Sequence, residues 1–194
     1  MTNEELLASL SGSLRQHMER IMPRLDQFEQ KLQDTEMNVL VFGPGKKKGH
    51  RLYQKRERIR AELNKVPGVR AHFPEDKEYA AAFRQKFGLA EGDPTALELA
   101  QANAADVIIA LEPGPGVEDE VAVMSMRREL AMKIYNLLPK EYVPTASKSF
   151  SGILRGRLTK YYYSQAEVKR CDLATRICPE HVKGEQIRKA VGGL

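Results

Sequence analysis

Hydrophobic residues in the first 36 positions recur every three or four places, which is the pattern of one face of a helix. They are Leu7, Leu10, Leu14, Met18, Ile21, Leu25, Phe28 and Leu32. Thr2 and Glu5 fit a capping box at the start of this segment. Pro23 interrupts it, so either two helices or one kinked helix is predicted. We expect residues 1–36 to form a helical arm that packs on the rest of the chain or joins subunits of a homo-oligomer.

From residue 37 the pattern changes to short apolar runs, each followed by a glycine-rich or proline-rich turn and a helical segment. This order is typical of an α/β domain with a parallel sheet. The predicted strands cover 39–42, 69–73, 107–111, 134–138 and 160–163. The predicted helices cover about 51–64, 79–87, 94–103, 117–132 and 185–190, with a further short one after a capping box at 164–167. The sequence therefore predicts one Rossmann-like domain over 37–194, flanked by helices and preceded by the arm.

The composition fits this organisation. The chain has 194 residues, of which 42% are hydrophobic and 29% charged, as expected for one domain with an appendage. No apolar run approaches the roughly 20 residues that cross a bilayer, and the first residues lack the features of a secretory signal. We therefore expect a cytoplasmic protein that does not enter the membrane. Cys171 and Cys178 are expected to be ordinary thiols, and nothing in the sequence calls for a metal ion or a cofactor.

Charge is distributed unevenly along the chain. Residues 46–60 contain eight lysines or arginines and one acid, whereas residues 91–120 contain eight acids and no lysine or arginine. A basic loop that faces an acidic one suits a small anionic ligand, but a basic surface also suits nucleic acid. Tyr161, Tyr162 and Tyr163 could stack on bases, although a strand is the preferred interpretation of this run. Nucleic-acid binding through residues 46–60 therefore stays open as an alternative.

Two loops lie where a parallel sheet normally binds its ligand, beyond the carboxyl ends of strands. In the first, Gly43, Pro44 and Gly45 form a turn that lets a ligand approach the backbone closely. Positive charge for phosphate follows this turn. It comes from Lys46, Lys47, Lys48 and Arg51. The loop matches neither the Walker A pattern nor G-x-G-x-x-G, so these residues are predicted to bind an anionic substrate without either motif.

The second loop, 113–116, leads into a predicted helix that begins with Val117 and three acids. Glu118 and Asp119 are expected to stabilise the helix N-terminus through its dipole. Glu120 lies one turn inside the helix and is predicted to point into the crevice near Glu112, at the end of the preceding strand. Two carboxylates converging on a sugar fit cleavage of a glycosidic bond. Substrate contacts are predicted at three neighbouring positions: Gly114, Gly116 and Asp119.

These residues, in this order and strand context, resemble the nucleoside 2-deoxyribosyltransferases and related Rossmann-like domains of the TIR-like and SLOG-like superfamily. In the transferases a strand ending in Leu-Asp-Gly is followed by Gly-Thr-x-x-Glu, whose glutamate is the nucleophile at the sugar C1. The lonely-guy phosphoribohydrolases have a similar glycine-rich turn. The resemblance covers about residues 38–130 and implies that Glu112 takes the place of the aspartate and Glu120 that of the nucleophile.

The chain departs from the transferase pattern in two places. Val117 replaces the usual threonine, and Gly114 stands where the transferases have another aspartate. These departures argue against transfer between bases and are compatible with hydrolysis or with binding without turnover. The leading hypothesis is therefore N-glycosidic cleavage of a nucleotide or nucleoside-like substrate by Glu120, with Glu112 orienting the sugar. The alternative is a non-catalytic nucleotide-sensing module that couples binding to assembly through its N-terminal arm.

Overall fold

Five parallel strands form the central sheet. The computed structural model describes residues 11–45, 51–111, 117–139, 159–163 and 172–192. The strands are β1 (Met37–Phe42), β2 (Val69–His72), β3 (Val107–Leu111), β4 (Ile134–Pro139) and β5 (Thr159–Tyr163). They lie side by side in the order β2-β1-β3-β4-β5, and each neighbouring pair is parallel. The predicted α/β class with a parallel sheet is confirmed, and so are all five predicted strands.

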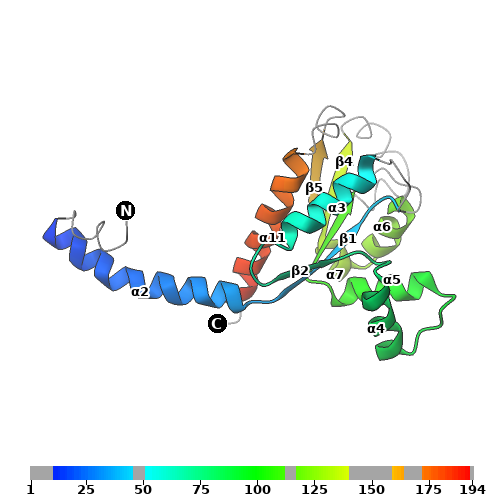
Figure 1. Cartoon of the computed structure of the whole chain (residues 1–194), viewed down its shortest axis with the longest axis horizontal. Helices are drawn as coiled ribbons and strands as arrows, with labels where there is room; N and C mark the ends of the chain where they lie inside the picture. The colour runs from blue at the N-terminus through cyan, green and yellow to red at the C-terminus, as the bar shows by residue number, and fades with distance from the viewer. Residues whose placement is uncertain (1–10, 46–50, 112–116, 140–158, 164–171, 193–194) are drawn as a thin grey trace.

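Helices cover the sheet and extend beyond it (Figure 1). They are α2 (Gly12–Asp34), α3 (Arg51–Leu63), α4 (Lys77–Phe87), α5 (Pro94–Ala104), α6 (Val117–Ser125), α7 (Arg128–Ala131) and α11 (Asp172–Gly192). The start of α5 follows the prediction, since the Asp93 carboxylate accepts a hydrogen bond from the Ala96 amide at 2.9 Å and Pro94 occupies the first helical position. The capping boxes expected at 2–5 and 164–167 lie outside the described residues.

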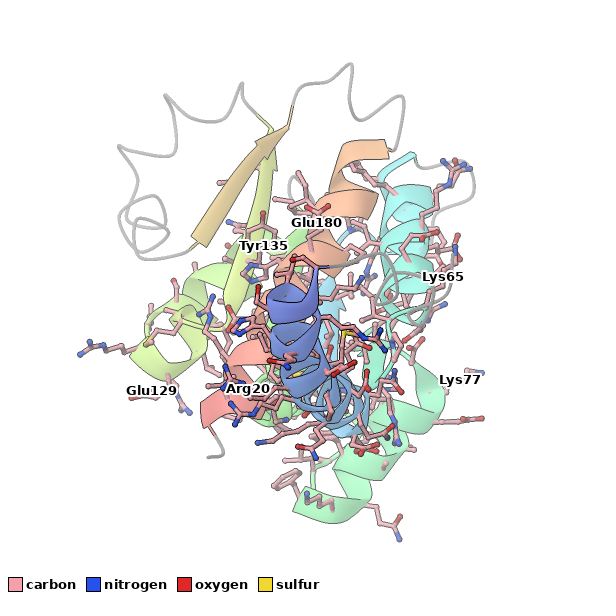
Figure 2. All side chains as sticks on the ribbon, turned by 90° about the vertical axis from the view of Figure 1, so that its left-hand side faces the viewer. Arg20, Lys65, Lys77, Glu129, Tyr135 and Glu180 are labelled. Atoms are coloured by element: carbon pink, nitrogen blue, oxygen red, sulfur yellow. The ribbon has the colours of Figure 1, made fainter. Side chains whose placement is uncertain are left out.

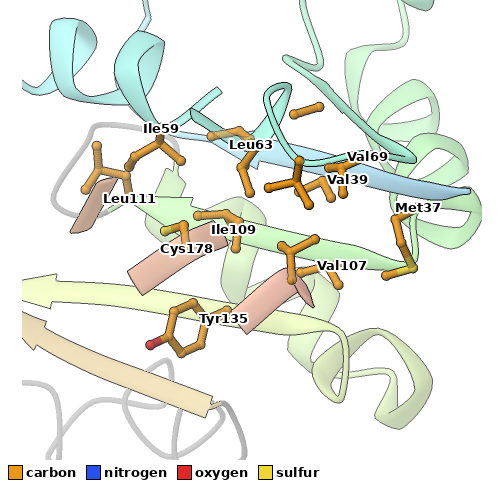
Figure 3. Packing of buried hydrophobic residues seen from close by; sticks show 14 of the residues in the cluster. Met37, Val39, Ile59, Leu63, Val69, Val107, Ile109, Leu111, Tyr135 and Cys178 are labelled. Atoms are coloured by element: carbon orange, nitrogen blue, oxygen red, sulfur yellow. The ribbon is translucent and has the colours of Figure 1, made fainter. Parts of the chain in front are cut away.

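The core consists of two apolar layers, one on each face of the sheet. Alternate residues of a strand point to opposite faces, and β1 divides in this way: Val39 and Val41 belong to one layer, Leu40 and Phe42 to the other. In the first layer α3 and α11 pack on the sheet through residues such as Ile59, Leu63 and Cys178 (Figure 3). In the second layer α5, α6 and α7 pack on the opposite face. The strands are therefore buried on both sides, as is usual for a parallel sheet.

The described part of the N-terminal arm contains one helix, α2. Pro23 lies inside α2 without dividing it, and none of the residues of α2 is buried. The helix extends away from the sheet, and its C-terminal end meets α11 (Figure 1). At this junction the Gln186 side-chain nitrogen lies 2.9 Å from three carbonyl oxygens, those of Leu32, Thr35 and Pro67.

A glycine is required beside this anchor. Gly68 adopts a φ of +77°, and a Cβ at this position would stand 2.6 Å from the Thr35 carbonyl oxygen and 2.8 Å from Nε2 of Gln186. Any other residue at this position would have a strained left-handed backbone conformation and a steric clash at its Cβ.

Two predicted helix boundaries were wrong. The helix expected over 117–132 is divided into α6 and α7, because Met126 and Arg127 donate backbone hydrogen bonds to carbonyls three residues earlier, a tighter arrangement that ends an α-helix. After this break Leu130 and Ala131 are buried against the second layer. The last helix, expected over 185–190, begins already at Asp172 and contains Pro179.

The strand order creates a crevice at one edge of the sheet. From β1 the chain moves outward to β2, and it then returns to place β3 on the other side of β1. Connections that leave the carboxyl ends of β1 and β3 toward opposite sides open a crevice between them, and ligands of doubly wound sheets bind there. Phe42 and Leu111 end these two strands.

Candidate functional site

A cavity of about 550 Å³ lies at this crevice. We call it the switch-point cavity. It is lined by Phe42, Gly43, Gly45, Arg56, Pro74, Glu75, Lys77, Ala80, Arg84, Pro94, Leu97, Glu98, Val117 and Glu120. The structure therefore brings the glycine turn after β1 and the Glu120 side chain to one cavity, although they are far apart in the sequence.

Gly43 is explained by close packing within the protein. A Cβ at this position would lie 2.9 Å from Cδ of Arg56 and 3.4 Å from Cβ of Leu111. The missing side chain thus makes room for a buried arginine. Gly45, by contrast, has nothing within 4 Å of the position of a Cβ, so the backbone there is open to an approaching ligand.

Arg56 joins the loops that surround the cavity. Its side chain is only 2% exposed and lies with its guanidinium carbon 4.1 Å from the centre of the Phe73 ring. The guanidinium donates to the Val41 carbonyl at 2.8 and 3.1 Å and forms a bidentate pair with Glu75 at 2.6 and 2.7 Å. Such charge-assisted, bidentate bonds are strong and directional, so Arg56 fixes the end of β1 relative to the loop after β2.

Two glutamates meet at the other side of the cavity. Glu98 comes from α5 and Glu120 from the first turns of α6. Burial, the nearby Glu98 carboxylate and to a lesser extent Glu75 and Asp119 raise the pKa of Glu120 to about 7, although Arg56 opposes this shift. Burial and Glu75 also raise the pKa of Glu98. Partly desolvated carboxylates that repel one another in a cleft are candidates for proton transfer or for stabilising positive charge.

The two glutamates also border a second, smaller pocket. This pocket, of about 120 Å³, is lined by Asp119 together with Glu98 and Glu120. Asp119 itself is exposed and does not line the switch-point cavity, so its predicted contact with substrate would have to come through this side pocket.

Helix α4 contributes two further cations to the cavity, beside Arg56 from α3. Lys77, Ala80 and Arg84 occur at positions i, i+3 and i+7, and so they lie on one face of the helix. Nε of Arg84 is buried, and no residue that the structure describes accepts a hydrogen bond from it. Arg56 and Arg60 differ in this respect, because carboxylates of Glu75 and Asp76 pair with them.

Several predicted site residues lie outside the described part of the chain. These are Lys46, Lys47, Lys48, Glu112, Gly114 and Gly116. Arg51 is the first residue of α3, but its side chain is likewise outside the description. Pro44 is buried, and its carbonyl oxygen lies 3.4 Å from the Arg56 guanidinium, so its visible role is to hold the turn.

Five charged residues of the cavity are not among the predicted site residues. Glu75 and Lys77 follow the carboxyl end of β2, so the rule that selected the other two loops applies to this loop as well. In the sequence, Arg56 and Glu98 appear only as members of the two charged blocks, and Arg84 belongs to neither. The spacing of Lys77 and Arg84 on one helical face was a usable signal.

Burial changes the interpretation of the basic segment. Lys55 is 0% and Arg56 2% exposed, and Arg60 pairs with Asp76 at 3.1 Å. These three side chains are therefore engaged within the protein, which reduces the positive surface that this segment could offer to nucleic acid. The tyrosine run forms β5, as preferred.

Other classes of site find no support in the part of the chain that the structure describes. Within it, no group of His, Cys, Asp or Glu side chains has the arrangement to hold a metal ion. No helix among the described residues is long and apolar enough to span a bilayer. Cys178 is a buried free thiol whose pKa burial raises to about 12, so it is a core residue and a poor nucleophile.

Comparison with known proteins identifies no family. No family model matches the sequence, and no curated protein matches it. Among solved structures, a conserved protein from Enterococcus faecalis V583 is similar with 16% sequence identity and a TM-score of 0.39, over 79% of this chain and 99% of that one. A likeness at this level says nothing about function, so the function is argued from the site.

Proposed function

We propose that the chain hydrolyses the N-glycosidic bond of a nucleotide-like or nucleoside-like substrate bound in the switch-point cavity, with Glu120 facing C1 of the sugar. The observation that carries this proposal is the position of Glu120: it lies in the crevice beside Glu98, and its pKa is raised to about 7. The α/β fold and the strand order support a small-molecule ligand at this place.

The chemistry follows from the charge that develops on the sugar. As the bond between C1 and the base nitrogen breaks, its electron pair leaves with the base and C1 becomes positively charged. Water then gives its hydroxyl to C1 and its proton to the base. Glu120 and Glu98 are destabilised as anions by burial and mutual repulsion, and a cation forming beside them relieves that repulsion. The cavity would therefore bind the transition state more tightly than the ground state.

Glu112 retains the role that the resemblance implies, that of orienting the sugar. Glu98 is the second carboxylate whose position the structure describes, and we assign to it the stabilisation of the charged sugar together with Glu120. Removal of the Glu120 charge is the direct test of this arrangement.

The test is incubation of the chain with nucleoside monophosphates, nucleosides and NAD, with the free base measured by chromatography. Loss of a group that acts at the reacting atoms costs about 10²- to 10⁴-fold in rate, so we expect Glu120→Gln to lower turnover by this amount. Glu129→Gln, an exposed residue of α7, is the matched control and should leave turnover unchanged. Equal turnover by Glu120→Gln and the unmodified chain would remove Glu120 from the mechanism.

The pH profile gives a second test. Glu120 must be ionised to stabilise the sugar cation, and its pKa lies near 7 in the free protein. The rate at low substrate concentration should therefore fall as the pH drops through about 7. A rate that stays flat down to the ordinary carboxyl range would contradict the assignment. Binding of nucleotides with no release of base would instead favour the sensing module.

A further inference from the structure

The charges of the switch-point cavity come from several elements. The carboxylates of Glu98 and Glu120 come from α5 and α6, whereas Lys77 and Arg84 come from α4. The charged groups that shift the pKa of Glu120 are Glu98, Arg56, Glu75 and Asp119. Lys77 and Arg84 thus come from a different helix than the two carboxylates, and together they offer a ligand of the cavity charges of both signs.

One of the α4 cations has a buried hydrogen-bond donor without an acceptor among the described residues. Nε of Arg84 is shielded from solvent and finds no acceptor among the residues that the structure describes. A buried N–H of a guanidinium without an acceptor is costly, and an anion bound in the cavity would satisfy it. Lys77 lies two turns earlier on the same face of α4, is exposed and also lines the cavity; Figure 2 labels it at the start of that helix.

We propose that Lys77 and Arg84 form a phosphate subsite, so that the ligand of the cavity is a nucleoside monophosphate with its phosphate on α4 and its sugar toward Glu98 and Glu120. This inference rests on the proposed function for the position of the sugar, but binding of the phosphate needs no catalysis. Arginine and lysine are the usual partners of phosphate oxygens. The subsite differs from the Lys46–Lys48 loop to which the sequence assigned the phosphate.

The test compares ribonucleoside 5′-monophosphates with the corresponding nucleosides in titration calorimetry. The Glu120→Gln chain is used so that the probes stay intact. Charge-assisted hydrogen bonds of this kind correspond to about tenfold to hundredfold in affinity, so at least one monophosphate should bind more tightly than its nucleoside by that factor. The double variant Lys77→Met and Arg84→Met should lose this preference and leave nucleoside binding unchanged.

Lys86→Met is the matched control, because Lys86 lies on the same helix over the Phe87 ring and does not line the cavity. An unchanged preference in the double variant, or no preference in the starting chain, would overturn the subsite. If the preference depends on α4 but the unmodified chain never releases base, the subsite stands and the proposed hydrolysis fails. The two ideas are thus tested separately.

A second, independent observation concerns the arm. Helix α2 spans 23 residues, contains Pro23 and buries none of its side chains. Figure 2 shows it nearly end-on, in front of the body and carrying Arg20. Helices in proteins owe most of their stability to packing of an apolar face, and an internal proline weakens a helix. A partner that covers the apolar face of α2 would therefore stabilise it.

The apolar residues of α2 define that partner. Their spacing alternates strictly between four and three, which is the heptad pattern of a coiled coil. This seam consists of Leu14, Met18, Ile21, Leu25, Phe28 and Leu32. Leu14 and Leu25 are 47% and 45% exposed, which is high for large apolar side chains. Pro23 lies on the opposite side from the seam, so it would not enter the contact.

We infer that α2 of a second copy of this chain covers the seam, with the two helices parallel. In a parallel pair, Arg24 of each helix lies beside Glu29 of the other helix. Each of these two equivalent contacts joins opposite charges. An antiparallel pair centred on the same seam would place Arg15 beside Glu29 but Arg24 against Arg24, a like-charge contact that the parallel pair avoids. The charges flanking the seam therefore favour a symmetric pair with both bodies at the same end.

Mass measurement by light scattering after gel filtration tests this inference. We expect a dimer for the full chain and a monomer for Ile21→Lys with Leu25→Lys. Gln16→Lys with Gln27→Lys, on the side away from the seam, is the control with equal added charge and should stay dimeric. Arg24→Glu should weaken the dimer, and Glu29→Arg in the same chain should restore it. A monomeric starting chain, or a seam variant that stays dimeric, would overturn the inference.

Discussion

Replacement of Glu120 by glutamine should make the protein more stable in alkaline solution. The pKa of Glu120 is raised to about 7 from an ordinary value of 4.5, chiefly by burial and by Glu98. The folded state thus holds this proton more tightly than the unfolded state does. The associated stability is complete below the unfolded pKa, near 4.5, and is lost as the pH rises through about 7.

The magnitude follows from the shift. Each pKa unit corresponds to about 1.4 kcal/mol, so the full difference would be roughly 3.4 kcal/mol. Glu120 remains partly open to solvent, and screening by water reduces the effect to on the order of 1–2 kcal/mol. Glutamine keeps the shape and cannot ionise, so the variant avoids this loss.

The assay is equilibrium unfolding in urea, followed by circular dichroism, at about pH 4, below both pKa values, and at about pH 8.5, above both. At the lower pH the two chains should differ little in free energy of unfolding. At the higher pH the glutamine variant should be more stable by on the order of 1–2 kcal/mol. Glu129→Gln, which is exposed, should behave like the unmodified chain at both. A glutamine variant that gains nothing at the higher pH would show that Glu120 is not destabilised as an anion, and the electrostatic argument for its function would fail with it.

Two further predictions concern the clamp beside the cavity. Gly43→Ala should lower the free energy of unfolding by about 1–3 kcal/mol, because the new Cβ would stand 2.9 Å from Cδ of Arg56. Gly45→Ala should change the free energy of unfolding by less than about 0.5 kcal/mol, because no atom lies within 4 Å of its new Cβ. Urea unfolding of both variants tests this difference. Arg56→Met should cost about 1–3 kcal/mol, since it removes the bonds to the buried Val41 carbonyl, whereas Glu75 is about half exposed and stays solvated. Arg58→Met, on the exposed side of the same helix, should cost under about 0.5 kcal/mol, and equal losses in the two arginine variants would contradict the clamp.

The fold was largely predictable because its signals are local. Short apolar runs bounded by turns predicted the strands, and β3 matches the expected 107–111 at both ends. The break between α6 and α7 was not predictable, since no glycine or proline marks it. The position of the break depends on two contacts. Leu130 packs in the second apolar layer, and the Lys133 ammonium donates hydrogen bonds to the carbonyls of Asn103 and Ala105 at the end of α5. These are tertiary contacts between distant parts of the chain.

The site was predictable only in part, for a similar reason. Glycine turns and acids after strands directed attention to Gly45 and Glu120, and both line one cavity. Their catalytic and binding roles stay predictions. In the sequence, Arg56 and Arg84 look like solvated charges of a basic helix. Only packing determines that Arg56 is buried and bonded to the Val41 carbonyl, and that Arg84 has a buried donor without an acceptor among the described residues. The charge blocks located the right regions without assigning individual residues.

The Gln186 anchor has a consequence for biosynthesis. The side chain that holds the carbonyls of Leu32, Thr35 and Pro67 comes from near the end of the chain. Because translation runs from the arm toward Gln186, α2 lacks this anchor while the residues between them are being made. Its direction on the body is fixed by these bonds only after Gln186 has been added.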